Sequence, residues 1–260
     1  MNPVMDVILS RKSVRAYEDR PVTDEVKGEI LHAAMRAPTA GNMMLYSIID
    51  VKDQSAKDTL ARTCDDQPFI AKAPVVLLFL ADYQRWWDYF MQSGVEQLCE
   101  QRGEPLRKPA EGDLFLACCD ALIAAQTAVI AAESLGLGSC YIGDIMENYE
   151  AHRDLFALPR YVFPICLLCL GYPTQQQRAR PMTTRFEKDF VVFEDRYRQL
   201  DRRELADLFR DMEERAAKIV EKPAGVENAG QWMYVRKFAA AFSVEMTRSV
   251  RAILHAWMGA

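Results

Sequence analysis

The sequence has only three histidines among its 260 residues, and they lie far apart, at positions 32, 152 and 255. Metal centres and nucleophilic triads usually place histidine beside other ligands or a nucleophile. We therefore expect no metal and no histidine-based hydrolase. A P-loop is also absent. The run GLGSCY at 136–141 lacks the third glycine of a dinucleotide-binding fingerprint and follows a predicted helix instead of a strand.

The cysteine spacing indicates neither a disulfide framework nor a zinc site. The seven cysteines are an odd number, and most lie in apolar runs, which is typical of reduced thiols in a core. Cys166 and Cys169 have CxxC spacing, but no second pair accompanies them. Residues three positions apart in a strand point to opposite faces, so we expect both to be core thiols.

An excess of positive charge and an uninterrupted apolar run are missing as well. Lys and Arg total 32 against 37 Asp and Glu, which gives a net charge of −5 and argues against general nucleic-acid binding. The most apolar stretch, 114–137, contains Asp120, Gln126 and Glu133, which are costly in lipid. The first residues lack the basic and apolar regions of a signal peptide. We expect a cytoplasmic protein that binds neither nucleic acid nor a membrane.

Half of the residues are hydrophobic and 27% are charged, as in globular proteins. Their patterns predict an α+β fold with a central mixed sheet flanked by helices. We expect a domain over 1–200 and a helical extension over 201–260. The strands are expected at 46–51, 74–81, 139–142 and 162–170, and the main helices at 3–10, 23–37, 54–62, 113–135, 147–156, 201–221 and 228–257.

Residues 83–112 form an excursion from this pattern that ends in a charged segment with two prolines and two glycines, which predicts a mobile loop. Its first part carries the aromatic side chains of Trp86, Trp87, Tyr89 and Phe90. Such a cluster serves equally well as a lid over a cleft or as a helix that packs in a core or an interface.

Several segments carry groups that suit an anionic or planar ligand. Arg11, Ser13 and Arg15 alternate, so they would face one side of an extended segment, and guanidinium forks suit a phosphate. Arg178 and Arg180 repeat this spacing. For each pair a solvated basic turn is the simpler interpretation. Two polar loop segments are less specific candidates for ligand binding: the turn TAGN at 39–42 and the loop that carries the amide of Gln67. Asp120 and Asp144 are single carboxylates, and the sequence shows no partner for either in acid–base chemistry.

Taken together, these segments resemble the nitroreductase family of flavoenzymes, over about residues 5–193. The matching runs are RKSVRAY at 11–17, APTAGN at 37–42, IAAESLGLGSCYIG at 130–143, LGYP at 170–173 and RARP at 178–181. Lys12 stands where the family usually has arginine. The chain beyond Tyr197 is similar to the oxygen-insensitive, NADPH-preferring subgroup, whose C-terminal helices embrace the partner subunit.

The resemblance implies an intertwined homodimer with non-covalent FMN and a two-electron, ping-pong reaction. NADPH or NADH is the implied reductant, and nitroaromatics, quinones or flavins are the acceptors. No catalytic side chain is implied, because the flavin carries the chemistry; Arg15 and Lys12 are candidates to tune the reduced flavin. The implied FMN contacts are Arg11, Lys12, Ser13, Arg15, Arg178 and Arg180 for the phosphate and ribityl chain, Thr39, Ala40, Gly41 and Asn42 along the ring edge, Gln67, and Tyr141, Ile142, Gly143 and Asp144 over the other ring face.

Other functions remain open at this point. One alternative is a related flavoenzyme with another acceptor, such as a reductive dehalogenase or a flavin-fragmenting oxygenase. Others are a flavin-binding protein without turnover and a helical interaction module. Arginines 196, 198, 202 and 203 would contact the 2′-phosphate of NADPH or form a solvated helix face.

Overall fold

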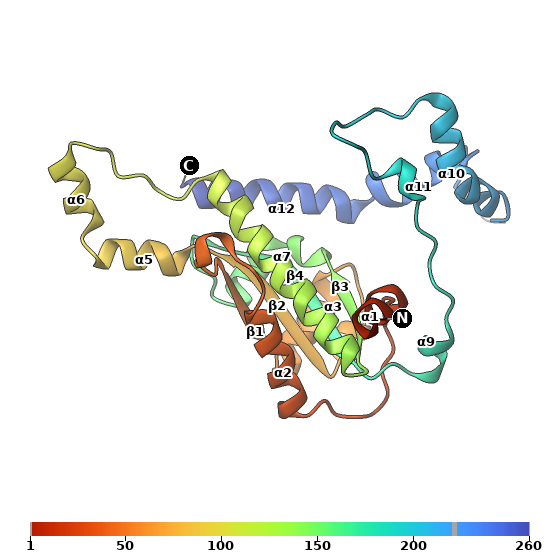
Figure 1. The fold of residues 1–260 in the computed structure, drawn as a ribbon, viewed down its shortest axis with the longest axis horizontal. Coiled ribbons are helices and arrows are strands. Elements are labelled where there is room, and N and C mark those ends of the chain that lie inside the picture. Colours follow the sequence, from red (N-terminus) through yellow and green to blue (C-terminus); the bar gives the residue numbers. More distant parts are fainter. Residues whose placement is uncertain (1, 220–222, 260) are drawn as a thin grey trace. The chain divides into compact units, whose positions relative to one another are not determined.

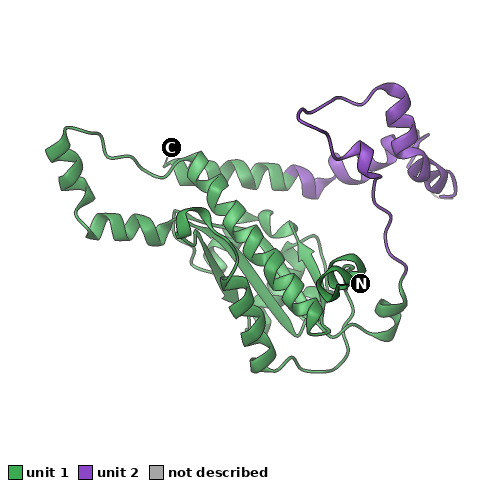
Figure 2. Cartoon of the chain, in the orientation of Figure 1, with its two compact units in different colours: residues 1–180, 245–260 green, residues 181–244 purple. Residues whose placement is uncertain are grey.

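The computed structural model describes residues 2–219 and 223–259. The chain divides into two compact units (Figure 2): residues 1–180 with 245–260 form the first, and residues 181–244 form the second. The second unit therefore begins at Pro181, upstream of the extension expected from residue 201, and the end of the chain belongs to the first unit.

The first unit is built on a four-stranded sheet with the order β1-β2-β4-β3. Its strands are β1 (Tyr46–Asp50), β2 (Val75–Asp82), β3 (Gly138–Ile142) and β4 (Val162–Gly171). All neighbouring strands pair antiparallel. The prediction of a mixed sheet is therefore wrong for these four strands, which are antiparallel throughout. A parallel contact occurs outside them, at the isolated bridge between Ser13 and Ser139. The strands themselves lie where the apolar runs predict them.

Helices cover both faces of this sheet (Figure 1). On one face, Leu77 and Leu168 pack with α2 (Asp24–Met35) and α7 (Glu111–Ser134); on the other, Leu78 and Leu167 pack with α3 (Gln54–Thr63) and α4 (Phe69–Lys72). Both central strands are buried on each side because their residues alternate between the two clusters. Cys166 and Cys169 belong to opposite clusters as free thiols, which confirms the interpretation of the CxxC pair.

Most helices begin and end close to the expected residues. Thr23 caps α2 by accepting a hydrogen bond from the Val26 N–H at 3.3 Å. The remaining helical elements are α1 (Pro3–Ser10), η1 (Ala40–Asn42), α5 (Gln84–Gln92), α6 (Val95–Arg102), η2 (Asp144–Met146), α8 (Tyr149–Leu155), α9 (Gln175–Ala179), η3 (Lys188–Phe190), α10 (Arg202–Ala217), α11 (Ala229–Met233), η4 (Tyr234–Phe238) and α12 (Ala241–Met258).

Two segments differ from the sequence-based expectation. Part of the predicted loop near residue 101 is helical, because α6 extends to Arg102 and ends at Gly103 in a left-handed conformation. The single helix predicted over 228–257 is divided into α11, a π-helical turn (η4) and α12. Residues 231–257 contain no glycine or proline, so the sequence carries no signal for this break.

Helix α7 is less enclosed than its composition predicts. One side packs on the sheet through Ala121, Ala128 and Val129, while the other exposes a set of apolar side chains: Phe115, Leu116, Leu122 and Ile123. Among the described residues, α7 is the one helix long and apolar enough to cross a membrane, and 44% of its most apolar window is buried within this fold. A helix that is apolar nearly all round is typically buried on every side, but only one side of α7 meets the core of this chain.

Candidate functional site

An extended arm, residues 11–18, connects the N-terminal helix to the ends of β3 and β4. The Val14 N–H donates to the Ser139 carbonyl at 2.9 Å, and the Glu18 N–H donates to the Tyr172 carbonyl at 2.8 Å. Val14 is buried, and the Tyr17 hydroxyl donates back to the Val14 carbonyl at 3.0 Å. These bonds fix the backbone that carries Arg11, Ser13 and Arg15.

Two glycines permit this close approach of the arm. A Cβ atom on Gly138 would lie 2.4 Å from a methyl carbon of Val14, and one on Gly171 would lie 2.7 Å from the ring of Tyr17. Any other residue at these positions would push the arm away from the strands. Gly138 and Gly171, which lie in the runs IAAESLGLGSCYIG and LGYP, therefore have a packing role.

Two arginines of this arm, Arg11 and Arg15, lie near a third, Arg180, that is distant in the sequence. Burial raises the pKa of the Cys140 thiol in β3, and the positive charges of Arg15, Arg11 and Arg180 all act against that rise. The Arg15 backbone N–H and the Arg180 guanidinium both donate to Oε1 of Gln177, at 3.4 and 3.2 Å. All three guanidinium groups thus lie within electrostatic range of Cys140 in β3, and Gln177 joins the Arg180 side chain to the backbone of the arm. The Arg15 guanidinium lies 5.9 Å from the centre of the Phe69 ring.

None of these three guanidinium groups forms an ion pair with a carboxylate within residues 2–219 and 223–259. Glu133 is the nearby acid that interacts with Arg11 at longer range, and burial raises the pKa of that carboxyl. A dianionic phosphate would compensate the charge of the three cations. The donor set on the arm and at Arg180 therefore fits the phosphate of FMN.

Lys12 and Arg178 have other partners. The Lys12 ammonium donates to the carbonyls of Arg178 and Arg180, at 2.6 and 2.5 Å. The Arg178 guanidinium donates to Glu18 at 2.9 Å and to the Pro173 carbonyl at 2.9 Å. Both cations fasten residues 173–180 to the arm, so they position Arg180 instead of presenting a free charge.

The turn of residues 39–42 lies beside helix α7 and is held by it. The buried carboxylate of Asp120 accepts hydrogen bonds from the N–H groups of Ala40 and Leu45, at 3.0 and 3.1 Å. Gly41 and Asn42 are exposed and adopt left-handed backbone conformations. The Asn42 side-chain amide makes no hydrogen bond within the described part of the chain, so it is available to the polar edge of a planar ligand.

The aromatic side chains of the excursion divide between two environments. The Trp86 indole donates to the Met43 carbonyl at 2.7 Å and packs against Phe90, with ring centroids 5.6 Å apart. Trp87 instead packs edge-on against the buried ring of Tyr161. Tyr89 is 60% exposed. Helix α5 is therefore anchored at the 39–45 turn on one side and in the core on the other.

Gln67 and the segment after β3 meet at a hydrogen bond. The Gln67 amide donates to Oδ2 of Asp144 at 2.8 Å and to the Cys64 carbonyl at 2.9 Å. Gly143 is exposed with open space around its Cα, and the Tyr141 hydroxyl donates to Gln126 at 3.3 Å. The structure thus links two residues that the sequence treats as separate polar groups.

Sequence reasoning missed three residues of this region. Gln177 joins Arg15 to Arg180, Glu133 accepts hydrogen bonds from the Ser139 N–H and hydroxyl at 3.1 and 2.7 Å, and Glu147 is buried behind Asp144. Burial raises the pKa of Glu133. The apolar setting of Glu133, inside a long hydrophobic run, was the one signal that a half-buried carboxyl was present.

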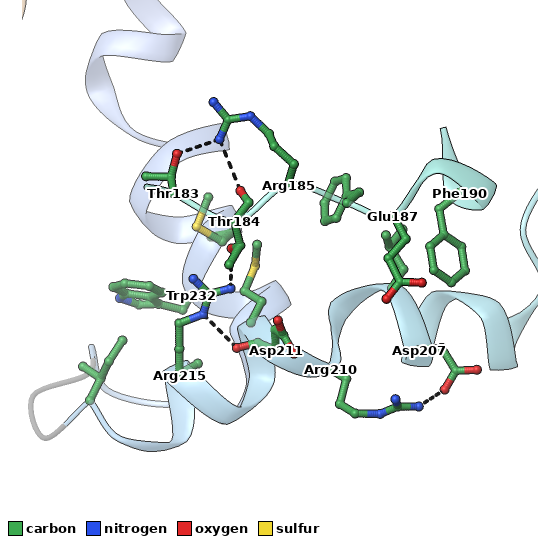
Figure 3. A pocket seen from close by; sticks show the side chains of 16 residues that line it. Thr183, Thr184, Arg185, Glu187, Phe190, Asp207, Arg210, Asp211, Arg215 and Trp232 are labelled. Carbon is green, nitrogen blue, oxygen red and sulfur yellow. Dashed lines mark hydrogen bonds and ion pairs between the residues drawn. The ribbon is translucent and has the colours of Figure 1, made fainter. Parts of the chain in front are cut away.

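The second unit contains a cavity of about 640 Å³ (Figure 3). Its arginines are bound within the unit: Arg215 donates to the Thr184 hydroxyl at 2.8 Å, and Arg210 pairs with Asp207. Arg198, one of the arginines considered for a 2′-phosphate, pairs with Glu204 at 2.6 Å. These contacts favour a structural role for Arg198, Arg210 and Arg215.

Comparison with known proteins gives consistent matches. The family model described as "Nitroreductase family" matches residues 8–172. An oxygen-insensitive NADPH nitroreductase of Salmonella typhimurium is 32% identical over 206 residues, 79% of each chain. An FMN reductase [NAD(P)H] of Bacillus subtilis is 32% identical over 232 residues, 89% of this chain and 88% of the relative. Among solved structures, NfrA2 of B. megaterium superposes with a TM-score of 0.79 at 28% identity, covering 99% of this chain and 98% of that one.

Proposed function

The chain belongs to the nitroreductase family, and from this we propose that it is an FMN-dependent NAD(P)H oxidoreductase. When bound, FMN accepts two electrons from NAD(P)H and passes them to an electron acceptor in a ping-pong sequence. The observation in this chain that best supports the proposal is the cluster of Arg11, Arg15 and Arg180, three cations without carboxylate partners beside β3.

These arginines would bind the FMN phosphate. Each charge-assisted hydrogen bond contributes roughly 1.5–3 kcal/mol, so two or three of them suffice for tight non-covalent retention. Ser13, on the same arm, is placed to bind a phosphate oxygen or a ribityl hydroxyl. Lys12 and Arg178 would act indirectly, by holding Arg180 against the arm.

The turn of residues 39–42 would receive the polar edge of the flavin ring. Asp120 holds the backbone of this turn from below, so the Asn42 amide and the turn are positioned before the ligand arrives. Residues 141–144 would cover the other face of the ring, where the absence of a side chain at Gly143 leaves room for close approach.

We further propose a homodimer. The exposed apolar side of α7 and the exposed Val4, Met5, Ile8 and Leu9 of α1 are an unusually apolar surface for a monomer. Burying it against a second copy would stabilise the chain and enclose the flavin site. The C-terminal extension is proposed to pack on that partner. We propose that this dimer is a soluble protein of the cytoplasm.

Nitroaromatics, quinones or free flavins are the proposed acceptors. The aromatic segment of α5 lies beside the 39–45 turn through the bond from Trp86 to Met43, so it would form one wall of the acceptor site. Planar acceptors gain from stacking on such side chains. A stopped-flow screen of acceptors distinguishes this proposal from a dehalogenase or a flavin-fragmenting enzyme.

A visible spectrum of the purified protein followed by anaerobic addition of NADPH or NADH tests the proposal. We expect a yellow protein whose flavin absorbance bleaches. Colourless protein with no affinity for added FMN would contradict flavin binding. Protein that is yellow but does not bleach with either nucleotide would contradict the oxidoreductase activity and favour a flavin-binding protein without turnover.

A further inference from the structure

Glu147 is a buried carboxyl group with no donor for one of its oxygens. The residue follows η2, is 4% exposed, and its Oε1 receives no hydrogen bond from the described part of the chain. Burying an ionised carboxylate in this way is costly, so the group is stable when it carries a proton. Burial is the main reason that the pKa of Glu147 is raised to about 8, and the nearby carboxyl group of Asp144 raises it further through its charge and a hydrogen bond.

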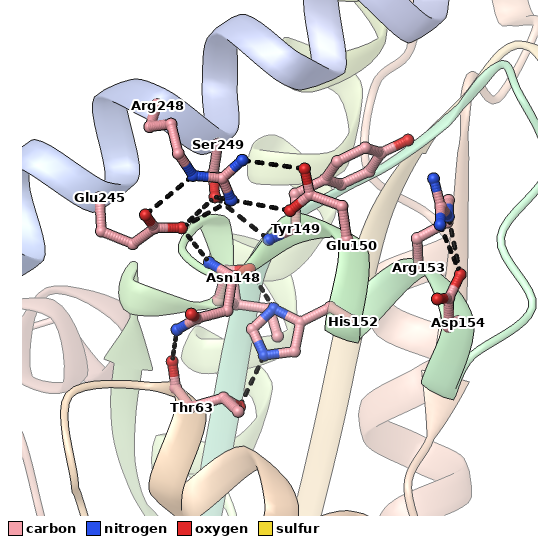
Figure 4. A network of polar contacts seen from close by, with 11 residues as sticks. Thr63, Asn148, Tyr149, Glu150, His152, Arg153, Asp154, Glu245, Arg248 and Ser249 are labelled. Carbon is pink, nitrogen blue, oxygen red and sulfur yellow. Dashed lines mark hydrogen bonds and ion pairs between the residues drawn. The ribbon is translucent and has the colours of Figure 1, made fainter.

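Basic groups near Glu147 do not neutralise it. The imidazole of His152 in α8 is bound between the Ile145 carbonyl at 2.9 Å and the Thr63 hydroxyl at 2.7 Å, and burial lowers its pKa, which keeps it neutral. Arg248 of α12 is held by Glu150 and Glu245, at 2.7 and 2.8 Å (Figure 4).

The acidic groups that face Glu147 come from three elements. Asp144 lies in η2, Asp65 in the turn after α3 and Glu245 in α12, and all three disfavour a charge on Glu147. The neighbouring Cys64 thiol is buried, and its raised pKa keeps it uncharged as well. The protonated form of Glu147 is therefore favoured from every side.

Asp144 connects this proton to Gln67. Its Oδ2 accepts from the Gln67 amide, whose other N–H is directed to the Cys64 carbonyl. An amide has two N–H donors and one carbonyl acceptor. With both donors engaged by the protein, Oε1 is the group that Gln67 has left for a ligand.

On the premise of the proposed function, we infer that Glu147 and Asp144 share one proton and thereby hold Gln67 as a hydrogen-bond acceptor for FMN. The Glu147 hydroxyl donates to the Asp144 carboxylate, which in turn fixes the Gln67 amide. Gln67 can then accept from a ribityl hydroxyl or the ring N3–H. Glu147 and Asp144 are positioning residues, because they act through Gln67.

Loss of the shared proton disrupts this arrangement. Two adjacent carboxylates repel each other, Asp144 turns away, and the Gln67 amide is freed to rotate. FMN affinity should consequently fall as the pH rises through the pKa of Glu147, whereas an affinity set by the arginines and the phosphate alone would not fall in this range.

The test measures FMN dissociation from the holoprotein by ultrafiltration between pH 6.5 and 9. If binding requires the protonated pair, linkage predicts that the wild-type Kd rises about tenfold by pH 9, one unit above the pKa of about 8. Glu147→Gln, which still donates to Asp144, should give a constant Kd. Asp154→Asn, an exposed carboxylate of α8 paired with Arg153, is the matched control and should follow the wild type.

A second measurement detects the proton itself. Infrared difference spectra of wild type against Glu147→Gln at pH 7 should show one protonated carboxyl band that disappears above pH 9. A wild-type Kd that stays constant to pH 9, a rise that persists in Glu147→Gln, or the absence of the band would overturn the inference. If the protein binds no FMN, the proposed function fails, and the infrared band still decides whether Glu147 carries the proton.

Discussion

The carboxylate of Asp120 in α7 binds the backbone N–H of Leu45 at 3.1 Å, across 75 residues of sequence. Its second oxygen binds the Ala40 N–H, so one buried side chain holds both ends of the turn proposed to receive the flavin edge. Asp120 is thus a structural acid, and its position in an apolar helix has a physical reason: it satisfies backbone donors that the turn leaves without partners.

Replacing Asp120 tests this role. Asp120→Ala leaves the buried Leu45 N–H and the Ala40 N–H without acceptors, and each unsatisfied group costs about 1–3 kcal/mol. We expect the free energy of unfolding in urea to fall by about 2–6 kcal/mol, and FMN retention to fall with it. Asp120→Asn keeps one acceptor oxygen and should lie between.

The control for this change is Glu111→Gln, an exposed acid in the first turn of the same helix. Its loss removes only a favourable interaction with the helix dipole, worth at most about 1 kcal/mol. Equal destabilisation by Asp120→Ala and Glu111→Gln would show that the bonds to Ala40 and Leu45 are unimportant.

Gly138→Ala tests the close approach of the arm. The added methyl group would lie 2.4 Å from Val14, so the arm must move or the strand must shift, which costs about 1–3 kcal/mol. We expect lower stability and weaker FMN binding together. Gly112→Ala, where a Cβ meets open space, should leave both properties unchanged or slightly improved. Normal FMN binding by Gly138→Ala would show that the close approach of the arm to the strands is not needed for the FMN site.

Arg248 should make the attachment of α12 sensitive to acid. Its hydrogen bonds lower the pKa of Glu150 and of Glu245 to about 2. Because these values lie below the ordinary 4.5, the stabilisation is complete above about pH 4.5 and is lost as the pH falls towards 2. Arg248→Gln should lower the Tm by a few degrees at pH 7 and by less at pH 3.

Arg153→Gln is the comparison for that experiment, since Arg153 forms an exposed pair with Asp154 on the same surface. Its Tm should stay close to that of the wild type at both pH values. If the Arg248→Gln and wild-type Tm values differ by the same amount at pH 7 and pH 3, the ion pairs do not cause the acid sensitivity.

Lys12→Met tests the indirect role of the lysine. The change removes two hydrogen bonds to the carbonyls of Arg178 and Arg180, a loss of about 1–3 kcal/mol. We expect faster trypsin cleavage after Arg178, the site in this segment that is not followed by proline, and a weaker affinity for FMN. Lys12→Arg keeps the charge and should have the smaller effect. An unchanged cleavage rate in Lys12→Met would contradict this role.

The sequence was sufficient for much of the fold. The apolar runs of β2 and β4 and the Thr23 cap predict elements that the structure contains, because these signals are local. The break between α11 and α12 has no local signal. The exposure of Phe115 and Leu116 on α7 could not be predicted either, since hydrophobicity does not tell which side of a helix meets its own chain.

For the candidate site, the residue types were predictable but their partners were not. Arg178 and Lys12 have the composition of a phosphate site, yet Lys12 binds carbonyls 166 and 168 residues away and Arg178 pairs with Glu18, 160 residues away. The pairing of Gln67 with Asp144, and the burial of Glu147 behind them, likewise depends on tertiary contacts between segments about 77 residues apart.

The most direct test of the account compares the affinities for FMN and riboflavin, which lacks the phosphate, in wild type and in the double variant Arg15→Ala/Arg180→Ala. Wild type should prefer FMN by about a hundredfold or more, from two charge-assisted contacts. The double variant should stay folded by circular dichroism and lose this preference. A folded double variant that binds FMN as tightly as the wild type would contradict the claim that these arginines form a phosphate site.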